Sequence, residues 1–130
     1  MKTFLLFLLL LLSSSSLYGI IGETVEECTR RYGEPTFLLH NKKVAHFSNN
    51  GFEIKAIYKE GLCTSIIFRK EILSKKEIEE LLKLNSQGRE WIELDDGVWV
   101  TRDGVLYGAN SLQPHYMSIV YNKIKKKKDN

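Results

Sequence analysis

The chain has 130 residues, of which 43% are hydrophobic and 27% charged. These proportions are typical of one folded soluble domain and exclude disordered and collagen-like chains. The formal net charge is +3, and five lysines, Lys123 and Lys125 to Lys128, crowd the C-terminus. Without these lysines, Lys2 and Asp129, the remainder holds 13 basic against 15 acidic residues, so the basic balance belongs to the tail.

The start of the chain has the order of a signal peptide. Lys2 precedes an unbroken apolar run from Phe4 to Leu12, and serines and other small residues follow. The run is about half of the roughly 20 residues that a membrane-spanning helix needs. We therefore expect residues 1–19 to be a cleaved leader, with cleavage after Ser16 as the alternative, and residues 20–122 to form one domain. This protein should be secreted or periplasmic and not membrane-spanning.

The basic segment 123–130 is predicted to be a disordered, solvated tail. The alternative is a weak electrostatic contact of its lysines with an anionic surface. Nucleic acid is not an expected partner of an exported chain.

Two capping boxes predict where helices begin. In Thr24-Val25-Glu26-Glu27 and in Ser74-Lys75-Lys76-Glu77, the N-cap hydroxyl and the glutamate can each accept from the other residue's amide. Gly33 and Pro35 should end the first helix after about two turns. The second helix should bury a stripe of Ile78, Leu81 and Leu82 and end near 85–88.

Turn signals predict four antiparallel strands after each helix. The first four are Phe37–His40, Lys43–Ser48, Phe52–Lys59 and Leu62–Lys70. The last four are Glu90–Asp95, Val98–Arg102, Val105–Ala109 and Tyr116–Asn122. The fold class is therefore α+β, with two short helices packed on one or more antiparallel meander sheets in the order α-ββββ-α-ββββ.

The hydrophobic pattern also predicts the register of two hairpins. A three-residue loop, Lys59-Glu60-Gly61, keeps the apolar residues of both strands on one face, and it places Cys63 on the opposite face with Ile57 and Ile67.

Two-residue loops at the two Asp-Gly turns set Leu94 opposite Trp99 and Trp99 opposite Gly108, where the missing side chain leaves room for the indole. They also set Trp91 across from Arg102 as a cation–π pair.

Cys28 and Cys63 form either a disulfide, which the oxidising compartment outside the cytoplasm permits, or two buried thiols. The bridge requires the first helix to lie on the sheet face that carries Cys63.

Few residues suggest catalysis. His40, His46 and His115 have no metal-ligand spacing, and Asp95, Asp96 and Asp103 stand where turns favour aspartate. Motifs for a nucleophile, a phosphate, zinc or calcium are missing from the sequence. We predict no catalytic residue, no metal and no cofactor, and an enzyme is disfavoured.

The strongest candidate surface carries Trp91, Arg102 and Tyr107, because aromatic residues and arginine dominate binding hot spots. The alternative is that a helix or a chain terminus covers this face. The sequence thus favours a non-catalytic binding or interaction module with a protein partner. A secreted inhibitor or envelope-assembly factor is one alternative, and a small hydrolase or thiol enzyme is another.

The opening of the predicted domain resembles that of a family of small exported bacterial proteins to which no activity is assigned. The similarity is carried by Gly22-Glu23-Thr24, Glu27-Cys28, Arg31-Tyr32-Gly33, Pro35, the Ser74–Asn85 segment, Trp91 and Trp99. More distantly, the Gly-x-Thr and Gly-x-Pro pattern is similar to the domains of outer-membrane assembly lipoproteins and β-lactamase inhibitors. That likeness implies protein binding and no particular site residue.

Overall fold

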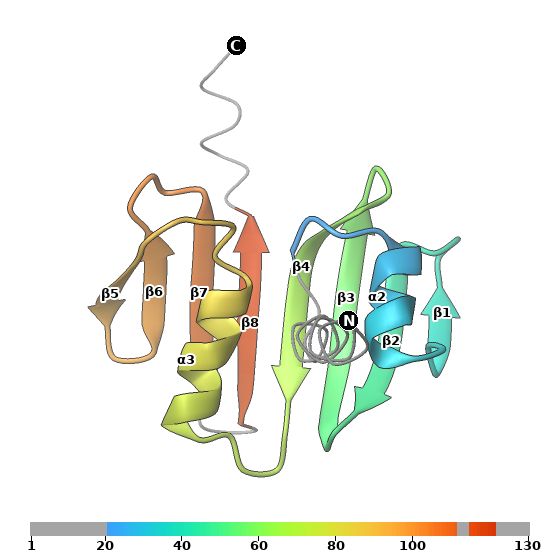
Figure 1. The fold of residues 1–130 in the computed structure, drawn as a ribbon, viewed down its shortest axis with the longest axis horizontal. Helices are drawn as coiled ribbons and strands as arrows, with labels where there is room; N and C mark the ends of the chain where they lie inside the picture. Colours follow the sequence, from blue (N-terminus) through green and yellow to red (C-terminus); the bar gives the residue numbers. More distant parts are fainter. Residues whose placement is uncertain (1–20, 112–114, 122–130) are drawn as a thin grey trace, which may run out of the picture.

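The computed structural model describes residues 21–111 and 115–121 (Figure 1). The predicted leader and basic tail lie outside these residues. The elements are α2 (Val25–Tyr32), β1 (Phe37–Leu39), β2 (Val44–Asn49), β3 (Phe52–Lys59), β4 (Leu62–Arg69), α3 (Lys75–Leu84), β5 (Trp91–Asp95), β6 (Val98–Thr101), β7 (Leu106–Ser111) and β8 (Tyr116–Tyr121). Within the described part of the chain, neither helix has the length and apolar character needed to cross a membrane.

Both capping boxes form as the sequence predicts. The Glu27 amide donates to the Thr24 hydroxyl at 3.1 Å, and the Thr24 amide donates to the Glu27 carboxylate at 3.0 Å. Ser74 and Glu77 repeat this exchange at the start of α3. These bonds satisfy amides that a helix N-terminus otherwise leaves unpaired, so each helix begins at a fixed residue.

All eight strands lie in one antiparallel sheet with the order β1-β2-β3-β4-β8-β7-β6-β5 (Figure 1). The α+β class with an antiparallel sheet is confirmed. The fourth strand of each half stands at the centre, where β4 pairs with β8, and the first strands, β1 and β5, form the two edges. One continuous sheet therefore joins the two halves of the chain.

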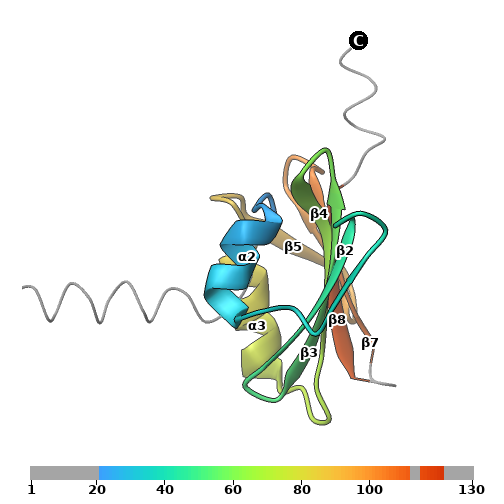
Figure 2. The same ribbon diagram turned by 90° about the vertical axis from the view of Figure 1, so that its right-hand side faces the viewer.

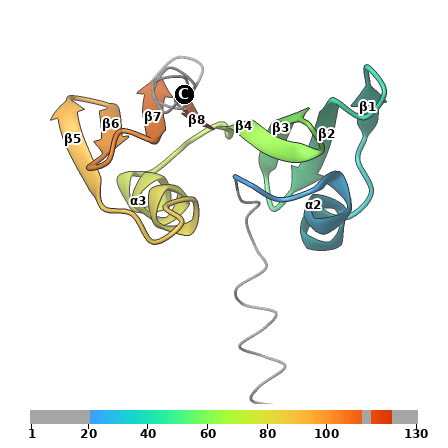
Figure 3. The same ribbon diagram turned by 90° about the horizontal axis from the view of Figure 1, so that it is seen from above.

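Both helices lie on the same side of this sheet (Figure 2). Seen from above, α2 lies against the half built from β1 to β4, and α3 against the half built from β5 to β8 (Figure 3). The Tyr32 ring of α2 packs on the Phe47 ring of β2 with centroids 5.2 Å apart. The core between helices and sheet includes Cys28, Tyr32, Phe47, Ile54, Ile66, Phe68, Leu81, Leu82, Leu106, Met117 and Ile119.

The β3–β4 hairpin corrects the first register prediction. Its loop has two residues, Glu60 and Gly61, both with positive φ, and Lys59 pairs with Leu62. Two-residue loops of this kind match the twist of the flanking strands, so the three-residue loop was wrong.

A bulge then restores the apolar face. Tyr58 pairs with Cys63 but Ile57 pairs with Ser65, which leaves Thr64 as the extra residue. Cys63 therefore shares the helix-covered face with Tyr58, and its predicted place beside Ile57 was wrong.

The β5–β6 hairpin corrects the second prediction. Asp95 pairs with Val98 across the two-residue turn, but Glu93 already pairs with Trp99, so Leu94 is a bulge. The predicted pairing of Leu94 with Trp99 was therefore wrong. The pairing of Trp99 with Gly108 across β6 and β7 is confirmed.

Candidate binding surface

The side of the sheet that faces away from α2 and α3 carries a row of apolar side chains. We call this side the open face, because no helix among the described residues covers it (Figure 2). Cross-strand pairing links one residue on each of the eight strands into a single line, which we call the apolar row. From edge to edge the row is Leu39, Val44, Ile57, Ser65, Val120, Tyr107, Val100 and Ile92. All of its members except Ser65 are aliphatic or aromatic.

Alternation along the strands creates the row. In β3, Ile54, Ala56 and Tyr58 are buried towards the helices while Lys55 and Ile57 point to the open face. Successive side chains of a strand point to opposite faces, so aligned strands bring every second residue together. The two bulges keep this alignment across both halves.

Much of the open face is accessible to solvent. Leu39 and Tyr107 are each 45% exposed and Val120 is 37% exposed. In the neighbouring line of residues, Phe37 is 64% exposed, and its ring meets the His46 ring edge to face at 6.0 Å. Single exposed apolar residues are common, but a contiguous apolar patch marks an interaction surface.

Two lysines flank the row. Lys55 and Lys59 lie on either side of Ile57 along β3, and both are exposed. Within the described residues, neither ammonium group has a carboxylate within salt-bridge distance. The open face therefore combines apolar area with two lysines that form no ion pair among the described residues.

The structure separates the three residues predicted as the binding site. Tyr107 lies in the middle of the apolar row. Arg102 is bound to Glu90, with its Nε donating to the carboxylate at 3.1 Å, and this guanidinium lowers the pKa of Glu90 by hydrogen bonding and charge. The cation–π pair with Trp91 is not formed.

Trp91 lies on the opposite, helix-covered side of the sheet. It pairs with Thr101, and its indole N–H donates to the Leu82 carbonyl oxygen at 2.6 Å. The Leu94 bulge moves β5 by one residue, so Ile92 takes the place on the open face that the prediction gave to Trp91. Alternation of apolar residues within each strand indicated most of the row, but nothing in the sequence marked the bulge.

Cys28 and Cys63 are fully buried free thiols in the structure. Burial raises the pKa of the Cys28 thiol to about 11, and burial together with the charge of Cys28 raises that of Cys63 to about 12. Both thiols are therefore protonated at neutral pH, and a protonated thiol is a weak nucleophile. The Thr64 bulge gives Cys63 this environment by turning it towards α2.

The remaining polar residues do not gather into a metal site. Among residues 21–111 and 115–121, no group of three or more His, Cys, Asp or Glu side chains is arranged to hold an ion. Asp103 instead organises its turn, since its carboxylate accepts from the Thr101 hydroxyl at 2.8 Å and from Arg89 Nε at 2.8 Å. These hydrogen bonds lower the pKa of Asp103.

Comparison with known proteins assigns the chain to no family. No known family's profile matches the chain, and no curated protein matches it. A solved structure that it is similar to is a cysteine-rich secretory protein from Staphylococcus aureus, with a TM-score of 0.45 and 10% identity over 80% of this chain. The chain spans 45% of the length of that protein.

Proposed function

We propose that this chain is a non-catalytic, exported binding module that docks a partner protein on the open face of its sheet. The observation that carries the proposal is the apolar row, a line of apolar side chains that crosses all eight strands. Burying such a row removes apolar area from water, which is the main driving force of protein association.

The size of the open face suits a protein partner. Eight strands spaced about 4.8 Å apart, each contributing about five residues of 3.3 Å, give a face of roughly 650 Å². A stable protein interface buries about 800 Å² on each partner. The face is therefore large enough for most of one interface and much larger than a small molecule needs.

Charge indicates what the partner should present. Lys55 and Lys59 would lie at the margin of the interface. Neither is paired with Glu53, which lies on the same face of β3 and accepts a hydrogen bond from the Ser48 hydroxyl at 2.7 Å. A partner with an apolar strip flanked by carboxylates would pair both lysines. We therefore propose a different protein with an acidic margin, whether it is an enzyme to be inhibited or an envelope component.

Photo-crosslinking tests this proposal in the native cell. A benzophenone amino acid replaces Tyr107 in one variant and Ile72 in a matched control, since Ile72 is 74% exposed but lies in the connection between β4 and α3. We expect one discrete protein adduct from position 107 and none from position 72. The partner is then identified by mass spectrometry, purified and titrated against the purified chain.

Charge reversal supplies the second arm. The double substitution Lys55→Glu and Lys59→Glu should weaken binding of the purified partner about tenfold or more, because it places carboxylates opposite carboxylates. The matched pair Lys76→Glu and Lys83→Glu, on α3, should leave binding unchanged. Equal adducts from both positions, an adduct with a second copy of this chain, or equal effects of the two charge reversals would each overturn the proposal.

A further inference from the structure

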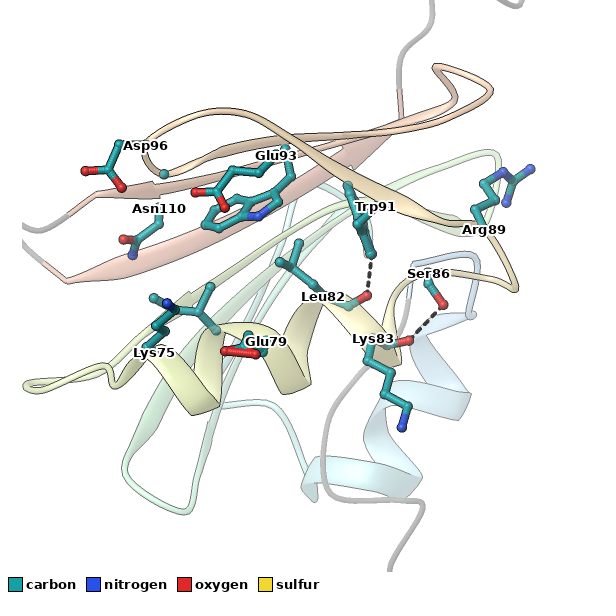
Figure 4. A pocket seen from close by; sticks show the side chains of 13 residues that line it. Lys75, Glu79, Leu82, Lys83, Ser86, Arg89, Trp91, Glu93, Asp96 and Asn110 are labelled. Carbon is teal, nitrogen blue, oxygen red and sulfur yellow. Dashed lines mark hydrogen bonds between the residues drawn. The ribbon is translucent and has the colours of Figure 1, made fainter.

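A separate groove lies on the helix-covered side of the sheet, between α3 and the β5–β6 hairpin (Figure 4). Its volume is about 750 Å³, and Trp91, Trp99, Ile78 and Leu82 form its apolar lining. We call it the tryptophan groove, since both tryptophans of the chain line it. It shares no residue with the apolar row.

The packing of α3 explains why the groove exists. A Cβ built on Gly108 of β7 would lie 3.0 Å from Leu82 Cδ2 and 3.1 Å from Met117 Cε. The absence of that atom lets α3 settle closely on β7 and β8, and leaves the inner side of β5 and β6 only partly covered. Trp91, held by its hydrogen bond to the Leu82 carbonyl, remains half-buried in the space between.

The groove opens beside a sheet edge. Among the described residues, β5 pairs with β6 and with no other strand, so its outer backbone groups have no strand partner there. Such an edge is a template for one more strand. A strand added to it would direct every second side chain towards the helix side of the sheet, where the groove lies.

The two walls of the groove carry different charge. Along α3, Lys75, Glu79 and Lys83 follow one another at four-residue spacing, so this wall has a net positive charge. Arg89 also lines the groove, but its guanidinium donates to the Asp103 carboxylate at 2.8 Å. The hairpin wall presents the carboxylates of Glu93 and Asp96 (Figure 4). The uncompensated charge of the hairpin wall is therefore negative.

We propose that the tryptophan groove and the β5 edge together bind an extended segment of a protein, in which basic and apolar side chains alternate on one face. The segment adds to β5 as a further strand. Its apolar side chain enters between the tryptophans and Leu82, and its basic side chains meet Glu93 and Asp96. Backbone pairing gives affinity here, while the tryptophans and carboxylates select the side chains.

A synthetic peptide and the intrinsic fluorescence of the protein test this inference. The probe is an acetylated and amidated heptapeptide, Thr-Lys-Thr-Ile-Thr-Lys-Thr, whose lysines and isoleucine fall on one face of a strand. Because both tryptophans line the groove, a change in tryptophan emission, excited selectively over tyrosine, reports on that site. We expect a saturable blue shift as the peptide is added.

Three controls define the chemistry. Replacing both peptide lysines with glutamate, or methylating its alternate backbone amides, should abolish the shift. The double substitution Glu93→Lys and Asp96→Lys should weaken binding about tenfold or more, whereas Glu53→Lys, on the open face, should leave it unchanged. Amide hydrogen exchange should slow along β5 when the peptide is bound and stay unchanged along the other edge strand, β1.

The inference fails if the glutamate peptide or the methylated peptide binds as well as the probe. It also fails if no saturable change occurs up to about 1 mM peptide, or if protection appears away from β5. The open-face substitutions Lys55→Glu and Lys59→Glu should not alter the titration, so this test and that of the proposed function succeed or fail independently.

Discussion

The two halves of the molecule share one layout, a short capped helix followed by four antiparallel strands, but they use their inner faces differently. In β2, β3 and β4, the residues that face α2 are buried, among them Phe47, Ile54 and Phe68. In β5 and β6, Trp91 and Trp99 stay half-buried, and of the residues in these two strands Thr101 alone is fully buried. The first half is therefore mainly core, while the second keeps part of its inner face available for binding.

Each half also contains one bulge, and the two bulges have opposite effects on exposure. The Thr64 bulge turns Cys63 into the core, where it is fully buried. The Leu94 bulge leaves Leu94 itself 63% exposed and moves Trp91 out of the apolar row into the groove. One extra residue in a strand thus completes a core in one place and forms a groove in the other.

The largest expected effect tests this difference in packing. Phe47→Ala in the first half should lower the free energy of unfolding by about 3 to 5 kcal/mol, because it leaves a cavity in a close-packed core. Trp99→Ala removes a larger side chain from the second half, yet it should cost only about 1 to 2 kcal/mol because the indole is half-buried. Urea unfolding followed by circular dichroism measures both.

Losses of equal size in the two variants would contradict the comparison. They would indicate that the inner face of β6 is packed as tightly as that of β2. In that case no groove would be open for a ligand.

A smaller effect should appear in alkaline solution and belongs to the first half alone. The thiols of Cys28 and Cys63 have folded pKa values of about 11 and about 12, against an ordinary value of 9.0. Above pH 9 they ionise in the unfolded chain while the folded chain still holds their protons, so stability should fall as the pH rises. Between pH 9 and 10 the loss should be about 1 kcal/mol for each thiol.

The double variant Cys28→Ser and Cys63→Ser should lose only about 0.7 kcal/mol across this window, a loss that comes from two buried tyrosines. Burial raises the pKa of Tyr32 and Tyr58 above the ordinary value of 10.0, so at pH 10 each is half ionised in the unfolded chain and still protonated in the folded chain. The comparison ends there because the contribution of the tyrosines grows at higher pH. A thiol assay in denaturant should detect two thiols for each chain. If it detects none, and the loss of stability is no larger than in the double variant, the sulfurs are bridged and the first core does not hold two free thiols.

Local signals predicted the parts of the fold that depend on neighbouring residues. The hydroxyl and glutamate of each capping box set the helix starts at Thr24 and Ser74, and alternating apolar residues marked the strands. The pairing of Trp99 with Gly108 was also predicted correctly, because both strands kept strict alternation up to their turn. These features need only the chain within a few residues of each position.

The candidate site depended on features that local patterns do not encode. A bulge at Leu94 or Thr64 needs no special residue type, and each shifts the register by one residue. The first bulge puts Ile92 on the open face in place of Trp91. The second turns Cys63 towards the helix-covered face. The pairing of β4 with β8 joins residues far apart in the sequence. Tyr107 and Val100 share a face, as the sequence pattern predicts, but the apolar row is apparent only when all eight strands are aligned.

One face of the sheet is covered by the helices and the other is the open face. Hydroxyl-radical footprinting of the purified protein, read by mass spectrometry, measures this most directly. Tyr107 and Phe37 should be oxidised rapidly, while Met117, on the inner face of the central strand β8, should be protected although methionine is intrinsically the more reactive residue. Rapid oxidation of Met117 together with protection of Tyr107 would contradict the account.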